Sequence, residues 1–277
     1  MELDKIFDSI LEFSKKQKFL PELYEAFSIL FHRSKGTYKL VWYITAVCIM
    51  MIVMLISFVI FSLFNCLAVV NSLTNVNILT LVFFIISIFV VSVLITPFLH
   101  GYARMVSKDI FESLKSDLYD FLFFLHDFDE NKKVYLLWAM ILSFICVLLF
   151  CTSWLFSLGL SYWLSSFLPK VVVVYPLLSF LIRFLIISIV FSIVFPFIFT
   201  VLLVFVNNFG GSGIKHFKFV DIGLVITKSL KVYFMNFVKF LLIGFLCSIG
   251  LVSILGNLVT FPLGFLMVGI SYKNTKS

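Results

Sequence analysis

Three basic side chains in or beside apolar segments are the residues of this sequence best placed to do chemistry. Arg183 interrupts the apolar segment from Val171 to Val206, and His100 and Arg104 lie one helical turn apart just after another apolar segment. An ionisable side chain within a membrane segment usually marks a ligand or ion site, and a guanidinium group binds phosphate strongly. These three residues are therefore the candidate substrate-binding residues, for an anionic lipid headgroup.

The length of the apolar segments supports a simpler interpretation of the same residues. The 23 residues from Phe184 to Val206 would form a helix of about 35 Å, enough to cross a bilayer without Arg183. Arg183 would then lie near the outer interface, where its side chain can reach water and headgroups. His100 and Arg104 would do the same at the inner interface. We expect interfacial positions for all three rather than a buried anion site.

Recognisable catalytic and metal-binding motifs are absent from the sequence. It contains no HExxH, P-loop, GxSxG or dinucleotide-binding pattern. The acidic residues Asp127, Asp129 and Glu130 lack the spacing of a calcium-binding loop, the four histidines are far apart, and the five cysteines all lie in apolar segments. No Asp or Glu falls inside a predicted membrane segment, which disfavours proton-coupled or cation transport. We expect no enzyme activity, no cofactor and no metal site.

Composition shows that lipid is the solvent for much of this chain. Of the 277 residues, 62% are hydrophobic and 13% are charged, and the mean hydropathy is +1.16. A soluble domain is roughly half apolar and about a quarter charged. The net charge of +7 comes from basic residues scattered through the polar segments, with no recognisable nucleic-acid-binding module. The sequence therefore predicts an integral membrane protein that binds no nucleic acid.

The apolar segments predict an all-α fold, a polytopic bundle of about six transmembrane helices, because each segment holds the roughly 20 residues that a span requires. The spans are expected at about 40–65, 78–99, 134–157, 183–206, 233–255 and 256–272. Together they form a transmembrane domain, 40–272, between a cytoplasmic amphipathic segment, 1–39, and a short cytoplasmic tail, 273–277. In the N-terminal segment we expect two helices separated by Pro21.

The last apolar segment has two interpretations. It runs from Phe240 to Ile270, which is long for one span and short for two, and its middle contains helix-weakening residues (Gly250, Gly256, Asn257 and Pro262). We expect a tight hairpin of two short helices, and a single tilted span is the alternative.

Basic residues are distributed very unequally over the two sides of this topology. The N-terminal segment, the loops 100–133 and 207–239 and the tail hold 19 of the 21 Lys and Arg residues, whereas the opposite loops hold only Lys170, and Arg183 belongs to neither side. Loops rich in Lys and Arg stay in the cytoplasm. The sequence therefore predicts a multi-pass protein of the bacterial cytoplasmic (inner) membrane, with both termini in the cytoplasm.

A similar order of features occurs three times along the chain. An amphipathic stretch is followed by a helical hairpin, and the returning helix of each hairpin contains a proline: Pro97, Pro196 and Pro262. This order indicates three parallel helical-hairpin repeats. The alternative is that any six-helix membrane protein uses prolines and amphipathic stretches repeatedly.

Several of these segments resemble a known group of proteins. The Pro97-x-x-x-Gly101 ending, the linker GLVITKSLKVYFMNFVKF and the closing GNLVTFPLGFLMVGISY resemble uncharacterised bacterial six-helix membrane proteins, similar to the membrane domain attached to some glycerophosphoryl diester phosphodiesterases. The last segment of that group matches this chain at Gly256, Pro262 and Tyr272. The resemblance covers about residues 20 to 272. It implies the fold and no activity, since we expect no phosphodiesterase domain in this chain.

The absence of catalytic and metal-binding motifs limits the functions that the sequence suggests. We expect a scaffold, assembly or binding component of the membrane, whose partners are membrane lipids and other membrane proteins. A carrier or flippase for lipid-like or apolar substrates is the alternative, because proline-broken helices around an apolar interior suit such a substrate.

The charge distribution predicts the outcome of a topology experiment. Reporter fusions after residues 75 and 168 should be external, and fusions after residues 130, 215 and 277 should be cytoplasmic. Paired reporters that are active on opposite sides of the membrane measure this directly. An external C-terminus would contradict six spans and favour a single final span.

Overall fold

The protein is described here by a computed structural model of an all-α fold. The structure describes residues 2–15, 21–34, 36–72, 78–112, 114, 116–122, 136, 137, 140, 141, 143, 176–209, 219–250 and 254–276. The predicted span at 134–157 lies almost entirely outside these residues, so only the returning helix of the middle hairpin in the expected threefold repeat is described, as α7. Six spans and three repeats therefore stay predictions.

The elements follow the chain in a simple order. Two short helices come first, α1 (Glu2–Lys15) and α2 (Pro21–Leu30), followed by a β-hairpin of two-residue strands, β1 (Arg33–Ser34) and β2 (Thr37–Tyr38). Two long helices follow, α3 (Lys39–Ser72) and α4 (Ile78–Phe111). The remaining helices are α7 (Pro176–Phe209), α8 (Phe219–Met235), α9 (Phe237–Gly250) and α10 (Ile254–Lys276). Helices lie on both sides of Pro21, where the sequence predicts them.

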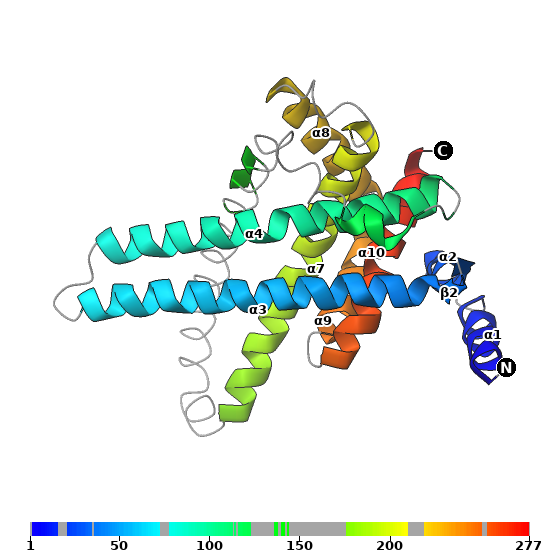
Figure 1. Ribbon diagram of the computed structural model, residues 1–277, viewed down its shortest axis with the longest axis horizontal. Coiled ribbons are helices and arrows are strands. Elements are labelled where there is room, and N and C mark those ends of the chain that lie inside the picture. The colour runs from blue at the N-terminus through cyan, green and yellow to red at the C-terminus, as the bar shows by residue number, and fades with distance from the viewer. Residues whose placement is uncertain are drawn as a thin grey trace.

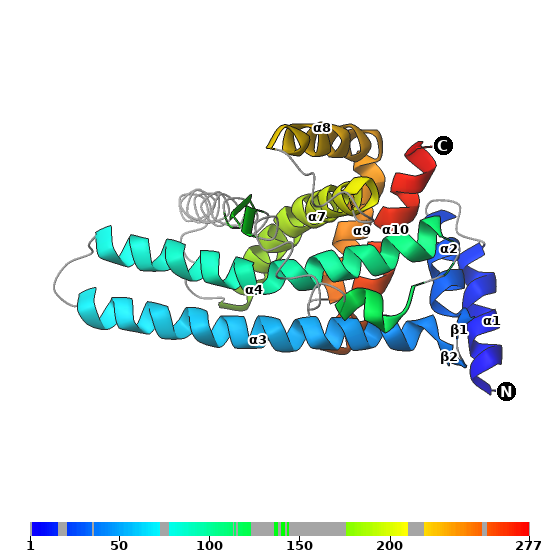
Figure 2. The ribbon, with the colours of Figure 1, turned by 45° about the horizontal axis from the view of Figure 1, so that its top comes forward.

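The long helices α3 and α4 form an antiparallel hairpin, and α7, α9 and α10 run across one half of it (Figure 1). Near the C-terminus the last turns of α4, α7 and α10 come together with the start of α9, whereas the opposite ends of these helices spread apart (Figures 1 and 2). Helix α10 is central, because it packs against α2, α3, α4, α7, α8 and α9. Its second half is buried almost throughout, from Leu266 to Tyr272.

Helix α7 carries a proline at the point where α8 and α9 pack on it. Pro196 lacks an N–H, so the carbonyl oxygen of Ser192, four residues earlier, has no helical donor. The backbone of α9 comes close to α7 at this carbonyl, since a methyl group on Gly244 would overlap the Ser192 oxygen. One residue further on, the Tyr233 hydroxyl of α8 donates to the Ile193 carbonyl at 2.8 Å. The proline therefore exposes backbone acceptors that neighbouring helices cover.

A second glycine permits a close approach at the end of the α3–α4 hairpin. A methyl group on Gly101 of α4 would overlap the carbonyl oxygen of Phe121, in the short helical segment that follows α4. The Pro97-x-x-x-Gly101 pattern of the sequence thus marks a place where backbone packs on backbone.

Two of the described helices contain stretches long and apolar enough to cross a membrane, Lys39–Ser57 in α3 and Ile85–Phe111 in α4. Helices α8 and α9 would supply a third only if Asp221–Met235 and Phe237–Gly250 were one span with an 89° bend. Ser192–Asn208 in α7 is a shorter apolar helix. An all-α fold with these helices fits a membrane protein.

Helix boundaries differ from the expected spans at several places, of which three bear on the packing, and α3 also continues beyond residue 65 to Ser72. Helix α4 continues beyond Leu99 to Phe111, because Tyr102, Met105 and Val106 continue its buried face. Helix α7 begins at Pro176, since proline is well tolerated in the first turn of a helix.

The third difference concerns the helix expected to begin at Tyr233, which is instead the last turn of α8. The Asn236 side chain donates to the Val232 carbonyl of α8 at 3.0 Å and to the Thr275 hydroxyl of α10 at 2.8 Å. These bonds hold the bend between α8 and α9. The final apolar segment contains two helices, α9 and α10, that pack on each other.

The close approach at Gly101 gives a stability prediction. Gly101→Ala should lower the free energy of unfolding by about 1–3 kcal/mol, because backbone atoms must move to admit the methyl group. Gly223→Ala in α8 is the matched control: its methyl group would meet nothing within 4 Å, and alanine favours a helix over glycine by up to about 1 kcal/mol. Denaturant unfolding in detergent, followed by circular dichroism, measures both. Equal effects of the two substitutions would contradict the packing at Gly101.

Candidate functional site

A fully buried ion pair joins the two helices of the long hairpin. Lys39 is the first residue of α3, and Asp109 lies in the last turn of α4. The Lys39 Nζ lies 2.6 Å from the Asp109 Oδ1, and neither side chain is exposed. Because burying an unpaired charge is very costly, each of these residues requires the other.

The ion pair is completed by hydrogen bonds from the segment after α4. Lys39 also donates to the Ser116 carbonyl at 2.6 Å and to the Ser116 hydroxyl at 2.9 Å, so its ammonium has three acceptors. Asp109 accepts from the Tyr43 hydroxyl at 2.9 Å and from the Ser116 N–H at 3.1 Å. The Lys39 ammonium has its donors satisfied, and the Asp109 carboxylate accepts from three groups. The cluster therefore joins α3, α4 and the segment after α4, and it offers no free group for chemistry.

The candidate residues His100 and Arg104 lie beside this cluster on α4 and contact other parts of the protein. His100 is buried, with its ring centroid 5.2 Å from that of Phe205 in α7. The Arg104 Nε is 3.6 Å from the Asp120 Oδ1, which also accepts from Lys108 at 2.5 Å. Both side chains are therefore turned toward protein groups, although the sequence alone suggested water or headgroups.

Arg183 is far from these two residues. It lies in the first turns of α7, and its side chain is outside the part of the structure that is described. His100 of α4 packs on Phe205, which also belongs to α7. Phe205 is 22 residues beyond Arg183, or about 33 Å along the helix. The structure therefore does not bring the three candidate residues into one site.

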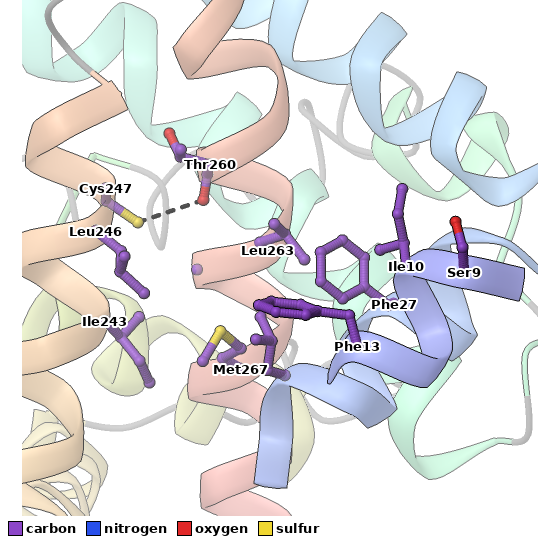
Figure 3. A pocket seen from close by; sticks show the side chains of 12 residues that line it. Ser9, Ile10, Phe13, Phe27, Ile243, Leu246, Cys247, Thr260, Leu263 and Met267 are labelled. Carbon is purple, nitrogen blue, oxygen red and sulfur yellow. Dashed lines mark hydrogen bonds between the residues drawn. The ribbon is translucent and has the colours of Figure 1, made fainter. Parts of the chain in front are cut away.

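A pocket of about 490 Å³ lies between the N-terminal helices and the last two helices (Figure 3). Ser9, Ile10 and Phe13 of α1 face it from one side, and Ile243, Leu246 and Cys247 of α9 from the other. Helices α2 and α10 complete the lining with Leu23, Phe27, Thr260, Leu263, Gly264 and Met267. The lining is almost entirely apolar and comes from segments more than 200 residues apart in the chain.

The few polar groups of the pocket are mostly engaged in local hydrogen bonds. The Ser9 hydroxyl donates to the Ile6 carbonyl of its own helix at 2.8 Å. The Cys247 thiol donates to the Thr260 carbonyl at 3.4 Å, the bond drawn in Figure 3. The Thr260 Oγ1 is buried and has no hydrogen-bond partner among the described residues. The pocket is thus suited to an apolar ligand, since the Ser9 hydroxyl is bonded within α1 and only the Thr260 hydroxyl is left without a partner among the described residues.

Helix α1 forms the outer wall of the pocket and is held chiefly by α2. The Phe7 ring stacks on Phe31 with centroids 4.1 Å apart and meets Tyr38 edge-on at 5.0 Å. Helix α2 is in turn fixed to α9 by the Glu22–Lys239 ion pair, with an Nζ–Oε1 distance of 2.6 Å. The pocket therefore lies between α1 on the outside, α2, and the pair formed by α9 and α10.

Comparisons with known proteins assign no class to this fold and site. No protein-family model matches the chain, no curated protein matches it, and no solved structure matches it. Among the described residues, no group of three or more His, Cys, Asp and Glu side chains could hold a metal ion. The function must therefore be argued from the pocket and its surroundings.

Sequence analysis missed both the ion pair and the pocket. The charge pattern includes Lys39 among the basic residues that orient the protein in a membrane, and it places Asp109 in the loop 100–133. The pocket had one local signal, the helical spacing of Ile10 and Phe13 beside charged residues, which predicts an amphipathic helix but not the surface it covers.

The ion pair gives a prediction with a built-in control. Lys39→Met leaves Asp109 buried without its cation, so it should lower the free energy of unfolding by about 3–5 kcal/mol. The double variant Lys39→Met/Asp109→Leu removes both charges and should recover part of this loss. Lys108→Met should cost less, because the Lys108 side chain is partly exposed and exposed pairs contribute about 1 kcal/mol or less. Denaturant unfolding in detergent tests all three, and a Lys39→Met effect no larger than that of Lys108→Met contradicts the prediction.

Proposed function

We propose that this protein is a multi-pass component of the bacterial cytoplasmic membrane that binds the hydrocarbon chain of a membrane lipid in the pocket between α1, α2, α9 and α10. The observation that carries the proposal is the pocket itself, an apolar space of about 490 Å³ inside a chain with the composition of a membrane protein. Ligand pockets have volumes of about 300–1,000 Å³.

The nature of the lining selects an apolar ligand. Water needs two to four polar partners to occupy a cavity, and the side chains here offer little beyond the Thr260 hydroxyl. A hydrocarbon chain makes dispersion contacts with every lining side chain and needs no partner for hydrogen bonds. In a membrane, lipid chains are also the most abundant apolar ligand.

The lining supports binding rather than reaction. A nucleophile needs an adjacent general base within hydrogen-bond reach, and none of the described residues that line the pocket is His, Asp, Glu or Lys. The one thiol among these lining residues, that of Cys247, is buried and bonded to a backbone carbonyl. We therefore propose a non-catalytic protein.

The proposed topology has six spans with both termini in the cytoplasm. The described helix ends that carry or adjoin basic residues, at Lys39, Lys108, Lys239 and Lys273, gather on the side of the molecule near the C-terminus (Figure 1). This arrangement supports the orientation that the positive-inside rule predicts.

A lipid carrier is the second candidate function, and one observation favours it. Prolines lie inside α4, α7 and α10, at Pro97, Pro196 and Pro262, and proline-broken helices are common where transporters change shape. A carrier would use the same pocket and would release its lipid to the other leaflet. A scaffold without a bound lipid would leave the pocket without a role.

Lipid retention tests the proposal. The protein is purified in a mild detergent, and mass spectrometry measures the amount of lipid that stays bound per protein. Leu263→Trp, which fills the pocket, should abolish most of the retained lipid. Phe245→Trp is the control, because Phe245 of α9 is exposed and does not line the pocket, so this variant should retain lipid as the parent does.

Two results would overturn the proposal: a parent protein that retains no lipid, or a Leu263→Trp variant that retains as much as the control. Transfer of a fluorescent lipid between leaflets of reconstituted vesicles separates the two candidates, since only a carrier accelerates the transfer.

A further inference from the structure

Helix α8 leaves the bundle at a sharp angle. It is bent by 89° from α9 at Asn236, and Figure 2 shows it lying across the end of α9 rather than along it. Helix α8 therefore does not continue α9, and the side chains that it exposes decide what it contacts. The bend adjoins Lys239, on the side of the molecule that the proposed orientation places in the cytoplasm.

One face of α8 is fixed to the protein. Its buried residues, Ile222, Val225, Ser229, Val232 and Tyr233, follow helical spacing. Helix α8 packs on α7, where the Tyr233 ring lies edge-on to Phe197 and its hydroxyl bonds the Ile193 carbonyl. The opposite face therefore points away from the bundle.

That outward face carries large apolar side chains and two lysines. Phe234 and Met235 are each about two thirds exposed, at 68% and 64%, and Leu224 and Leu230 are also exposed. Lys228 and Lys231 are exposed among them. The one acidic residue of α8 is Asp221, in its first turn. An apolar and purely basic face is the pattern of a helix that lies in a membrane interface.

The chemistry of this face fits one partner. Phe234 and Leu230 would bury apolar area among the acyl chains next to the headgroups. The Lys228 and Lys231 ammonium groups reach outward on flexible stems and pair with phosphate at headgroup level. A zwitterionic surface offers no net attraction to these charges, whereas an anionic surface attracts each by about fivefold at low salt.

We propose that the outward face of α8, formed by Leu224, Lys228, Leu230, Lys231, Phe234 and Met235, is a binding surface for anionic phospholipid headgroups of the cytoplasmic leaflet. This surface is separate from the pocket, whose lining includes no residue of α8. The proposal rests on the proposed orientation of the protein but does not need a lipid in the pocket.

Site-specific quenching tests the proposal in reconstituted nanodiscs. Phe234→Trp places a reporter on α8, and subtraction of the parent spectrum isolates its emission. Phospholipid with brominated chains quenches a tryptophan that contacts it. Brominated phosphatidylglycerol should quench this reporter several-fold more strongly than brominated phosphatidylcholine at the same mole fraction. The preference should fall at high salt, because salt screens exposed charges.

Neutral variants identify the source of the preference. Adding Lys228→Gln/Lys231→Gln to the reporter should abolish the difference between the two headgroups. Adding Lys5→Gln/Lys15→Gln, two exposed lysines of α1, changes the net charge equally and should leave the difference intact. A reporter that neither lipid quenches overturns the proposal and indicates a surface for a soluble partner. Equal quenching by both lipids, or a preference that survives the α8 variant, also overturns it.

Discussion

The buried pair of Lys39 and Asp109 is the constraint on which the rest of the structure depends. Two charges without solvent are stable only when each meets the other and all hydrogen-bonding positions are filled. The Tyr43 hydroxyl and the Ser116 backbone fill those positions, so three separate segments of the chain must meet at one point. This meeting fixes the base of the α3–α4 hairpin. It also holds the turn after α4, in which Leu114 has a φ of 66°, a conformation uncommon for a residue other than glycine.

Other polar contacts between helices lie on the same side of the molecule. Asn207 of α7 donates to the Tyr272 hydroxyl of α10, Asn236 donates to Thr275, and Lys239 pairs with Glu22. Toward the opposite ends, the described helices present exposed apolar side chains such as Leu55, Ile85 and Ile189. Hydrogen bonds and ion pairs thus join the described helices at one end of the bundle. Toward the other end, apolar packing and the backbone contact at Pro196 hold them, as the proposed membrane orientation would require.

This division has a consequence for lipid binding. In the proposed function, apolar side chains of α1, α2, α9 and α10 would hold a hydrocarbon chain in the pocket, whereas α8 would present lysines to a headgroup. The two proposed surfaces would recognise different parts of a lipid, one by dispersion and burial and the other by charge. Both depend on the tied ends: Glu22–Lys239 places α2 beside the pocket, and Asn236 sets the direction of α8.

Much of the all-α fold could be predicted from the sequence alone. Apolar segments of this length are typical of membrane helices, in which each backbone group bonds within its own segment, and the amphipathic spacing around Pro21 is enough to predict α1 and α2. These are local properties of a stretch of chain. The partners of Lys39, His100 and Arg104 were decided only by the tertiary structure, since Asp109 is 70 residues from Lys39 and no local pattern indicates which acid will face it. The pocket likewise exists only because α1 and α10, from opposite ends of the chain, lie side by side with a gap between their apolar faces.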